Sequence, residues 1–216
     1  MKEAFSTIFE GGMAEIVIKK SRFIATILPV TTEEEAIAFI EELKKKYWDA
    51  SHNCSAYILG TDNAVMRCSD DGEPSKTAGR PMLDVLLGRE LTNLVVVVTR
   101  YFGGTLLGTG GLVKAYQAAV IEGLNQCIII TKQLGLQLQI TTDYNTLGKL
   151  QYLAAQEGIT ILSSDYSDIV VVELLVPPSK LEYLSKKIAE LSSGSAIFDT
   201  LGQVYFTILD GKVQLL

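Results

Sequence analysis

The sequence predicts an α+β fold in two domains, residues 1–132 and 133–216. Runs of alternating or β-branched apolar residues, typical of strands, are interspersed with segments whose apolar residues recur every three or four positions, as in helices. From residue 133 onward the order reads strand, helix, strand, strand, helix, strand. A chain of 216 residues is also long enough to bury two separate small cores.

The first domain is predicted to start with strands and one strong helix. Five segments have the apolar alternation or short apolar run of a strand: 5–10, 14–21, 22–30, 53–60 and 64–70. The helix spans residues 31–48, where Thr32 and Glu35 form a capping box, acidic residues fill the first turn and lysines fill the last. The last two strands are expected to form a hairpin that turns at residues 61–63.

Two loops rich in glycine and charge follow, Ser69–Pro81 and Thr99–Gly111. Between them we expect a short helix, 82–91, whose entry is set by Pro81, and a buried strand, 91–101, with four consecutive valines. After the second loop we expect one more helix and a closing strand, residues 111–124 and 127–130.

The second domain has the pattern of a ferredoxin-like module. Its predicted strands are 134–142, 159–166, 168–176 and 195–209, and its predicted helices are 144–158 and 177–191. Gly158 is placed to end the first of these helices, and a pair of prolines leads into the second.

Composition excludes several classes of protein. No apolar run approaches the length of a membrane span, and the N-terminal residues lack a signal-peptide pattern, so we expect a soluble, cytoplasmic protein that does not bind membranes. The three cysteines are widely spaced and the chain has one histidine, so neither a disulfide framework nor a metal site is expected. The net charge of −6 argues against an indiscriminate nucleic-acid coat, although most lysines and arginines precede residue 133.

The second loop has the layout of an anion site, a strand followed by a glycine-rich loop and a helix. Its glycines are Gly103, Gly104, Gly108, Gly110 and Gly111, with Arg100 and Lys114 flanking them. A Walker loop would need lysine at position 109, where the chain has threonine, and the dinucleotide fingerprint lacks its third glycine. Backbone turns and tight packing explain these glycines as well as an anion does.

The other candidate chemistries are weaker. Asp70, Asp71 and Glu73 could bind a hard cation, but they lack calcium-loop spacing and surround an ordinary turn signal. His52 and Cys54 are two apart on a strand and so share a face, but a catalytic dyad also needs hydrogen-bond contact. No catalytic residues and no cofactor are predicted.

RNA recognition is a further candidate, and its alternative is that Phe102 packs in the core and Tyr101 is half-buried. Arg100, Tyr101 and Phe102 end a strand, where guanidinium and aromatic planes can stack on bases. Lys20 and Arg22 could add phosphate contacts. Lys76 and Arg80 in the first loop add further positive charge, so the two loops together look like one recognition surface.

Four stretches resemble the YigZ/impact family: Lys20–Ala25, His52–Tyr57, Asp71–Pro81 and Arg100–Tyr116. They occur in the family's order, the last two are long and specific, and the second domain is similar to the module that bacterial members carry. The sequence departs from the family pattern at Lys76, where glycine usually follows the preceding serine.

The resemblance implies a first domain with the β-α fold of a ribosomal small-subunit protein's domain 2, shared with elongation factor G domain IV and certain small-molecule kinases. It implies a second domain similar to elongation factor G domain V. We therefore expect a non-enzymatic protein that binds RNA, the ribosome or a translation-associated protein and regulates translation. The alternatives are a nucleotide-dependent phosphotransferase or other small-molecule enzyme that uses the glycine loop, and a protein-interaction module. The sequence does not indicate an oligomeric state.

Overall fold

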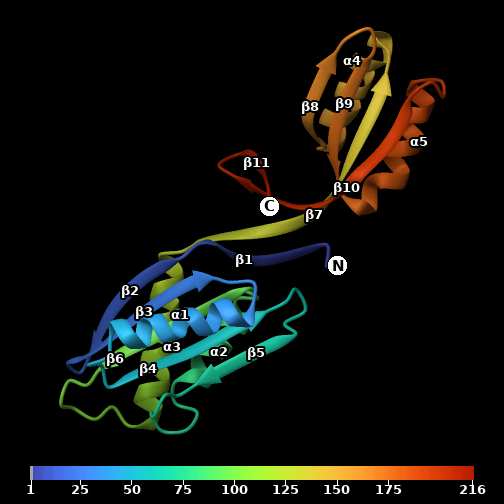
Figure 1. Cartoon of the computed structure of the whole chain (residues 1–216). Helices are drawn as coiled ribbons and strands as arrows, with labels where there is room; N and C mark the ends of the chain where they lie inside the picture. The colour runs from blue at the N-terminus through green and yellow to red at the C-terminus, as the bar shows by residue number, and fades with distance from the viewer. Residues whose placement is uncertain (1) are drawn as a thin grey trace. The chain divides into compact units, whose positions relative to one another are not determined.

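A computed structural model describes residues 2–216 (Figure 1). Contacts divide the chain into two compact units, the first ending at Thr131 and the second running from Lys132 to Leu216. Each unit combines helices with strands, so the fold is α+β, as the sequence predicts. None of the helices in residues 2–216 is long and apolar enough to cross a membrane.

The first unit is built on a five-stranded antiparallel sheet with the strand order β2-β3-β6-β4-β5. The strands of this unit are β1 (Ala4–Glu10), β2 (Gly12–Ile18), β3 (Ser21–Pro29), β4 (His52–Leu59), β5 (Val65–Ser69) and β6 (Leu94–Tyr101). All six were predicted, and β4 and β5 form the predicted hairpin. β1 lies outside this sheet and pairs with β7 (Ile128–Thr142).

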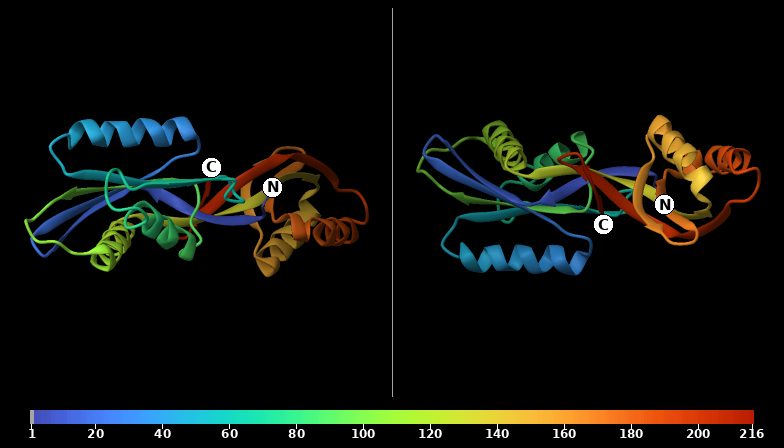
Figure 2. Two further views of the ribbon diagram at one scale, coloured as in Figure 1. Left: turned by 90° about the horizontal axis from the view of Figure 1, so that it is seen from below. Right: turned by 90° about the horizontal axis from the view of Figure 1, so that it is seen from above.

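Helices cover both faces of this sheet (Figure 2). α1 (Glu33–Lys46) lies on one face, whereas α2 (Gly79–Gly88) and α3 (Thr109–Asn125) lie on the other. The predicted capping box of α1 is confirmed. The Thr32 hydroxyl accepts from the Glu35 N–H at 3.2 Å, and the Glu35 carboxylate accepts from the Thr32 N–H at 3.2 Å.

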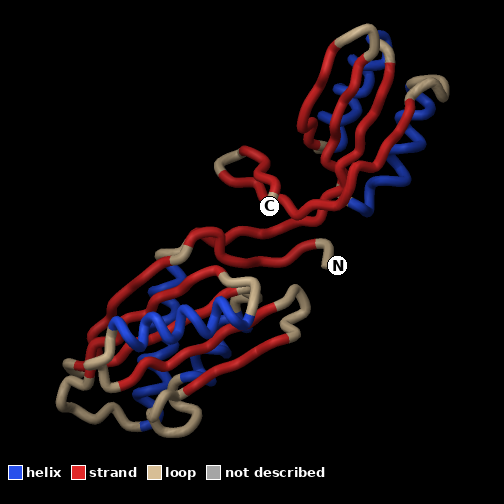
Figure 3. The backbone as a smooth tube through the Cα atoms, in the orientation of Figure 1, coloured by secondary structure: helices blue, strands red, loops and turns tan. Residues whose placement is uncertain are grey.

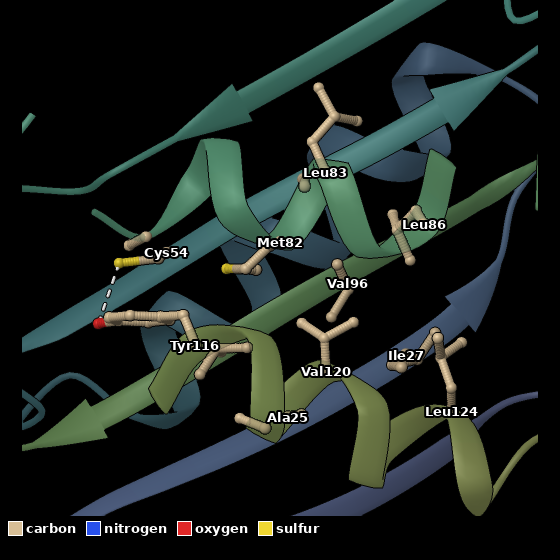
Figure 4. Close-up of a cluster of buried hydrophobic side chains, with 14 of the residues drawn as sticks. Ala25, Ile27, Cys54, Met82, Leu83, Leu86, Val96, Tyr116, Val120 and Leu124 are labelled. Carbon is tan, nitrogen blue, oxygen red and sulfur yellow. Dashed lines mark hydrogen bonds between the residues drawn. The ribbon is translucent and has the colours of Figure 1, made fainter. Parts of the chain in front are cut away.

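The larger core of the first unit lies between the sheet and the pair α2 and α3 (Figure 4). Met82 and Leu86 of α2 and Val120 of α3 are completely buried and lie near Val96 of β6. Burying each such side chain contributes about 1.5–3 kcal/mol, so this layer holds the two helices in place on the sheet. The loops that enter α2 and α3 are anchored by the same packing.

The start of α2 differs from the prediction. The helix begins at Gly79 rather than at Met82, because Asp70 supplies a cap from the end of β5. One Asp70 carboxylate oxygen, Oδ1, accepts from the N–H groups of Ala78 (3.0 Å) and Gly79 (2.8 Å). A carboxylate there satisfies N–H groups that a helix end leaves unpaired. Pro81 therefore sits inside the first turn instead of setting the entry.

The second unit has the predicted strand–helix order of a ferredoxin-like domain. After β7 come α4 (Tyr144–Glu157), β8 (Thr160–Tyr166), β9 (Val170–Val176), the 3₁₀ turn η1 (Pro178–Lys180), α5 (Leu181–Leu191) and β10 (Ile197–Leu209). Its sheet has the order β10-β7-β9-β8, with every neighbouring pair antiparallel. Gly158 ends α4 in the left-handed conformation, with φ of +65°, as the sequence predicts.

Two elements differ from the prediction in this part of the chain. The segments 127–130 and 134–142, predicted as separate strands, form the single strand β7, because no glycine or proline interrupts residues 131–133. A further strand, β11 (Lys212–Leu215), pairs with β10 and was not predicted. Asp210 and Gly211 make the turn between them with φ values of +50° and +74°, and an Asp-Gly pair is a strong hairpin signal that was present in the sequence.

Candidate functional site

The two loops singled out by the sequence, between β5 and α2 and between β6 and α3, lie at one end of the first unit (Figure 3). Beneath them is a buried ion pair. Arg100 Nη1 donates to Glu73 Oε1 at 2.5 Å, and the two residues are 5% and 7% exposed. Tyr116, on α3, donates its hydroxyl to the same Glu73 oxygen at 2.8 Å. One carboxylate thus ties the first loop to both β6 and α3.

Cys54 and Tyr116 continue this polar cluster into the core (Figure 4). Cys54 Sγ lies 3.3 Å from Tyr116 Oη and 3.1 Å from the carbonyl oxygen of Asp70. Burial raises the pKa of the Cys54 thiol far above its ordinary value and raises the pKa of the Tyr116 hydroxyl similarly. Both groups therefore stay neutral, and Cys54 is not a thiolate nucleophile.

His52 is held by the first loop rather than by Cys54. Its Nδ1 donates to the Asp71 carbonyl oxygen at 2.8 Å, and its Nε2 lies 3.9 Å from Glu73 Oε2. Within residues 2–216 no hydrogen bond joins His52 to Cys54. The shared strand face predicted for these two residues therefore does not produce a dyad.

The carboxylates of the first loop are used to fold it. Asp70 caps α2 and also accepts from the Lys76 N–H at 2.8 Å. Asp71 accepts from the Asn53 N–H at 2.7 Å and pairs with Lys44 at 3.2 Å. These bonds fix the loop against β4 and α2. In the part of the chain that the structure describes, no group of three or more metal-ligating side chains could hold a metal ion.

Lys76 adopts a left-handed backbone conformation, with φ of +64°. Glycine enters this region freely, whereas the Cβ of any L-residue makes it costly. A glycine would therefore fit this position without strain. Lysine at this position has a strained backbone, and its exposed side chain adds a positive charge.

The second loop packs tightly against the chain between β2 and β3 at Gly103. A Cβ at Gly103 would lie 2.0 Å from the carbonyl carbon of Lys20 and 2.3 Å from the Ser21 nitrogen. The Gly103 N–H donates to the Ser21 hydroxyl at 3.1 Å. Gly104 and Gly108 have positive φ values, +79° and +72°. Close packing explains Gly103, and backbone turns explain Gly104 and Gly108.

A pocket of about 500 Å³ lies between the two loops. Its polar floor consists of His52, Glu73 and Arg100. Its walls are mainly apolar and comprise Pro74, Phe102, Leu106, Leu107 and Leu112, and the start of α3 closes it at Gly108 and Thr109. Leu106 and Phe102 are 82% and 48% exposed, so apolar surface remains open to solvent at the rim.

The structure changes the expected role of Arg100. We expected its guanidinium to flank an anion site or to stack on bases, but it is buried, paired with Glu73 and placed between two rings. Arg100 Cζ lies 5.3 Å from the Phe23 ring centroid and 5.5 Å from that of Phe102. Arg100 therefore forms the floor of the pocket and positions Phe102 at its rim.

Arg22 and Tyr101 are cross-strand neighbours on β3 and β6, on the sheet face that carries α1. Arg22 Cζ lies 5.3 Å from the Tyr101 ring centroid, and Arg22 Nε bonds to Glu15 at 2.8 Å. Tyr101 donates its hydroxyl to Asp49 at 2.8 Å, and this bond raises the Tyr101 pKa. The pKa of Arg22 is raised chiefly by its hydrogen bond to Glu15. The bond from Tyr101 to Asp49 brings the chain just after α1 to this end of the sheet.

The end of α1 extends this region with residues that the sequence reasoning missed. Lys46 Nζ lies 5.2 Å from the Tyr47 ring centroid, and Trp48 is 83% exposed. We call Arg22, Lys46, Tyr47, Trp48 and Tyr101 the aromatic–basic surface. The signal is present in the sequence as three lysines followed by two aromatic residues, a pattern that is equally typical of a solvated helix face.

The remaining predicted site residues do not form one further cluster, and of them Lys20 is two residues from Arg22 of the aromatic–basic surface. Those exposed outside this surface and the pocket lining are Lys20, Lys76, Arg80, Gly104, Gly110 and Lys114. Arg80 pairs with Asp84 on α2 at 2.8 Å, and Lys114 lies on α3. Gly111 is half-buried against Leu107. Sequence reasoning did not select His52, Glu73 or Tyr116 as site residues, because their meeting depends on contacts between distant segments.

Two family models match the chain. The first, the Impact N-terminal domain, matches residues 19–124, and the second, Domain of unknown function (DUF1949), matches residues 140–195. A solved structure titled "Crystal structure of an hypothetical protein" is 35% identical, with a TM-score of 0.60, and the match covers 94% of this chain and 99% of that chain.

Curated relatives match over most of the chain. The chain is 42% identical to the IMPACT family member YvyE of Bacillus subtilis (strain 168), covering 91% of this chain and 90% of that protein. It is 39% identical to the IMPACT family member YigZ of Escherichia coli (strain K12), covering 82% and 88%. The Protein IMPACT homolog of Saccharomyces cerevisiae (strain ATCC 204508 / S288c) is 35% identical over 46% of this chain and 41% of that protein. The chain is therefore a member of the IMPACT family.

Proposed function

We propose that this protein binds single-stranded RNA, in the context of the ribosome or a translation factor, and does so without catalysing a reaction. The observation that carries the proposal is the aromatic–basic surface, where exposed Trp48 follows the cation–π pair of Lys46 and Tyr47. Aromatic side chains stack on bases of any sequence, and nearby cations attract the phosphate backbone.

Unpaired positive charge around this surface supports the same function. Lys19 and Lys20 form the exposed turn between β2 and β3, and Lys20 is two residues before Arg22. Lys45 and Lys46 end α1, and the ion pairs described for residues 2–216 include none of these four lysines. They remain available to phosphates. The expected similarity of both domains to domains IV and V of elongation factor G supports RNA as the partner by analogy of fold.

The first test is binding of a short single-stranded RNA, followed by the fluorescence of Trp48, the chain's single tryptophan. Stacking of a base on the indole should quench its emission. Variants that lack Trp48 have no such signal, so their binding is measured by the fluorescence anisotropy of labelled RNA. Trp48→Ala should raise Kd about fivefold or more, because stacking contributes about 1–3 kcal/mol per base. Tyr152→Ala, which removes an aromatic ring that is 72% exposed in the second unit, is the matched control and should leave Kd unchanged.

A second test separates electrostatic binding from stacking. The double variant Lys45→Ser/Lys46→Ser should reduce the slope of log K against log salt by about 0.7 for each phosphate that these lysines neutralise. Lys212→Ser, an exposed lysine of the second unit, should not change it. Ribosome co-sedimentation at low and high salt then checks the cellular partner. Absence of both RNA and ribosome binding at low salt would overturn the proposal.

A further inference from the structure

The pocket between the two loops combines an apolar wall with hydrogen-bonding groups at its two ends. Leu106 and Leu107 contribute to the wall, and the half-exposed ring of Phe102 is held at the rim by the Arg100 guanidinium. A volume of about 500 Å³ lies within the range of small-molecule sites, which are mainly apolar and have a few polar groups that fix orientation.

The first end of the pocket is the N-terminus of α3. Gly108 is the N-cap residue and provides no side-chain cap. The first helical hydrogen bond runs from the Leu112 N–H to the Gly108 carbonyl at 2.9 Å. Among the hydrogen bonds described for residues 2–216, none is donated by the N–H groups of Thr109, Gly110 or Gly111. These N–H groups and the helix dipole favour an anion, and glycine lets it approach the backbone closely.

The other end of the pocket is the polar floor. Arg100 is 5% exposed, and its Nε is a buried donor without a partner among the residues that the structure describes. The Asp71 carbonyl oxygen can only accept a hydrogen bond, so the His52 ring carries a proton on Nδ1. The other ring nitrogen, Nε2, faces the Glu73 carboxylate. Glu73 Oε1 already accepts from Arg100 and Tyr116, whereas Oε2 accepts no hydrogen bond described in the structure. Arg100 Nε is too fully covered to meet a ligand, so Glu73 Oε2 is the floor atom that remains free to accept a hydrogen bond from one.

The geometry points to a single unstacked nucleotide as the ligand of this pocket. Its base would lie along the leucine wall beside Phe102, with a donor on its polar edge toward Glu73 Oε2, and its phosphate would bind at the start of α3. Aromatic or apolar contact with the ring and hydrogen bonds to the base edge are the usual means of holding an unstacked base. The inference rests on the proposed RNA-binding function and adds a second contact region that reads one base.

A free nucleotide and a nucleotide within an RNA chain present the same chemistry, so the experiment uses both. We would titrate uniformly ¹⁵N-labelled full-length protein with AMP, with adenosine, with inorganic phosphate and with a short oligoadenylate, and follow the amide signals of Gly110 and Gly111. Leu106→Asp places a carboxylate at the rim where the side chain is 82% exposed, so the fold should be kept. Leu201→Asp, at an exposed leucine of the second unit, is the matched control.

We expect AMP or the oligoadenylate to shift both glycine amides, and Leu106→Asp to weaken that binding about tenfold or more while Leu201→Asp leaves it unchanged. Shifts with AMP indicate a site for free nucleotides, and shifts with the oligomer alone indicate a base within RNA. Equal shifts with inorganic phosphate alone, or adenosine binding as tight as that of AMP, would overturn the proposal. If RNA binds through Trp48 while the glycine amides and Leu106→Asp show no effect, the pocket inference fails and the proposed function stands.

Discussion

Arg100 Nη1 and Glu73 Oε1 lie 2.5 Å apart at the floor of the pocket, with side chains that are 6% and 3% exposed. The two residues are 27 positions apart and belong to the two different loop regions. Their ion pair is almost free of solvent, so neither charge has water as an alternative partner. The pair therefore fixes the first loop to β6.

Replacing Glu73 with glutamine should lower the free energy of unfolding by about 3–5 kcal/mol, because the Arg100 charge stays buried without its partner. Urea denaturation measures this change. Glu15→Gln, which breaks the half-exposed pair with Arg22, should cost less than about 1 kcal/mol. Equal losses in the two variants would contradict the importance assigned to the buried pair.

Lys76→Gly should raise the free energy of unfolding by up to about 1 kcal/mol. The left-handed backbone costs an L-residue about 1–2 kcal/mol, and the greater entropy of glycine in the unfolded chain offsets part of the gain. Lys114→Gly is a control of opposite sign, because it places glycine inside α3 and should destabilise by about 1 kcal/mol. Thermal unfolding of the two variants measures both changes in stability. Destabilisation by Lys76→Gly would show that the strain argument is wrong.

Gly103→Ala should destabilise the protein by about 3 kcal/mol or more, because the new Cβ would meet the backbone of Lys20 and Ser21. Gly110→Ala is its control, since a Cβ there meets nothing within 4 Å. That substitution should be neutral or stabilise by about 0.5–1 kcal/mol. Chemical denaturation of the two variants should separate a glycine required by packing from one that is free of such contacts. Similar stabilities would contradict this distinction.

Alkaline pH should destabilise the fold through Cys54 and Tyr116. Burial raises the pKa of both groups, so they keep their protons when folded and lose them when unfolded, above about pH 8.5 for cysteine and about pH 10 for tyrosine. Their contribution to stability is complete below those values. Above them the free energy of unfolding should fall by about 1.4 kcal/mol per pH unit for each group.

Urea unfolding at about pH 7 and about pH 10 measures this loss. Tyr57 adds to it in the same direction, because burial, followed by its bond to Glu33, raises its pKa to about 12. Cys54→Ala should lose less stability over this pH interval than the unmodified protein, even if it starts from a lower value. A stability that stays constant or rises with pH would contradict the neutral state assigned to both groups.

Local sequence patterns were sufficient for most of the fold. The capping box of α1, the Gly158 end of α4 and the hairpin of β4 and β5 depend on residues within a few positions of one another, and the structure contains all three. The start of α2 was missed because its cap, Asp70, lies nine residues before Gly79. The last hairpin was missed although its Asp-Gly signal is local.

The candidate site was predictable only in part. The sequence identified both glycine loops and placed Arg100, Tyr101 and Phe102 at a strand end. It could not show that Arg100 is buried, because burial depends on Glu73 and Tyr116, which arrive from two other segments.

By itself, the sequence determined the two-domain α+β fold, the order of most elements and the two loops that carry family motifs, because hydrophobic periodicity and turn chemistry act over short distances. Only the tertiary structure decided which charged residues are neutralised and which stay exposed. In the folded protein Arg100 is buried and pairs with Glu73, Trp48 is exposed to solvent, and a pocket lies between the loops. The reason is that desolvation and ion pairing depend on which residues are neighbours in space, and the order of residues along the chain does not show this directly.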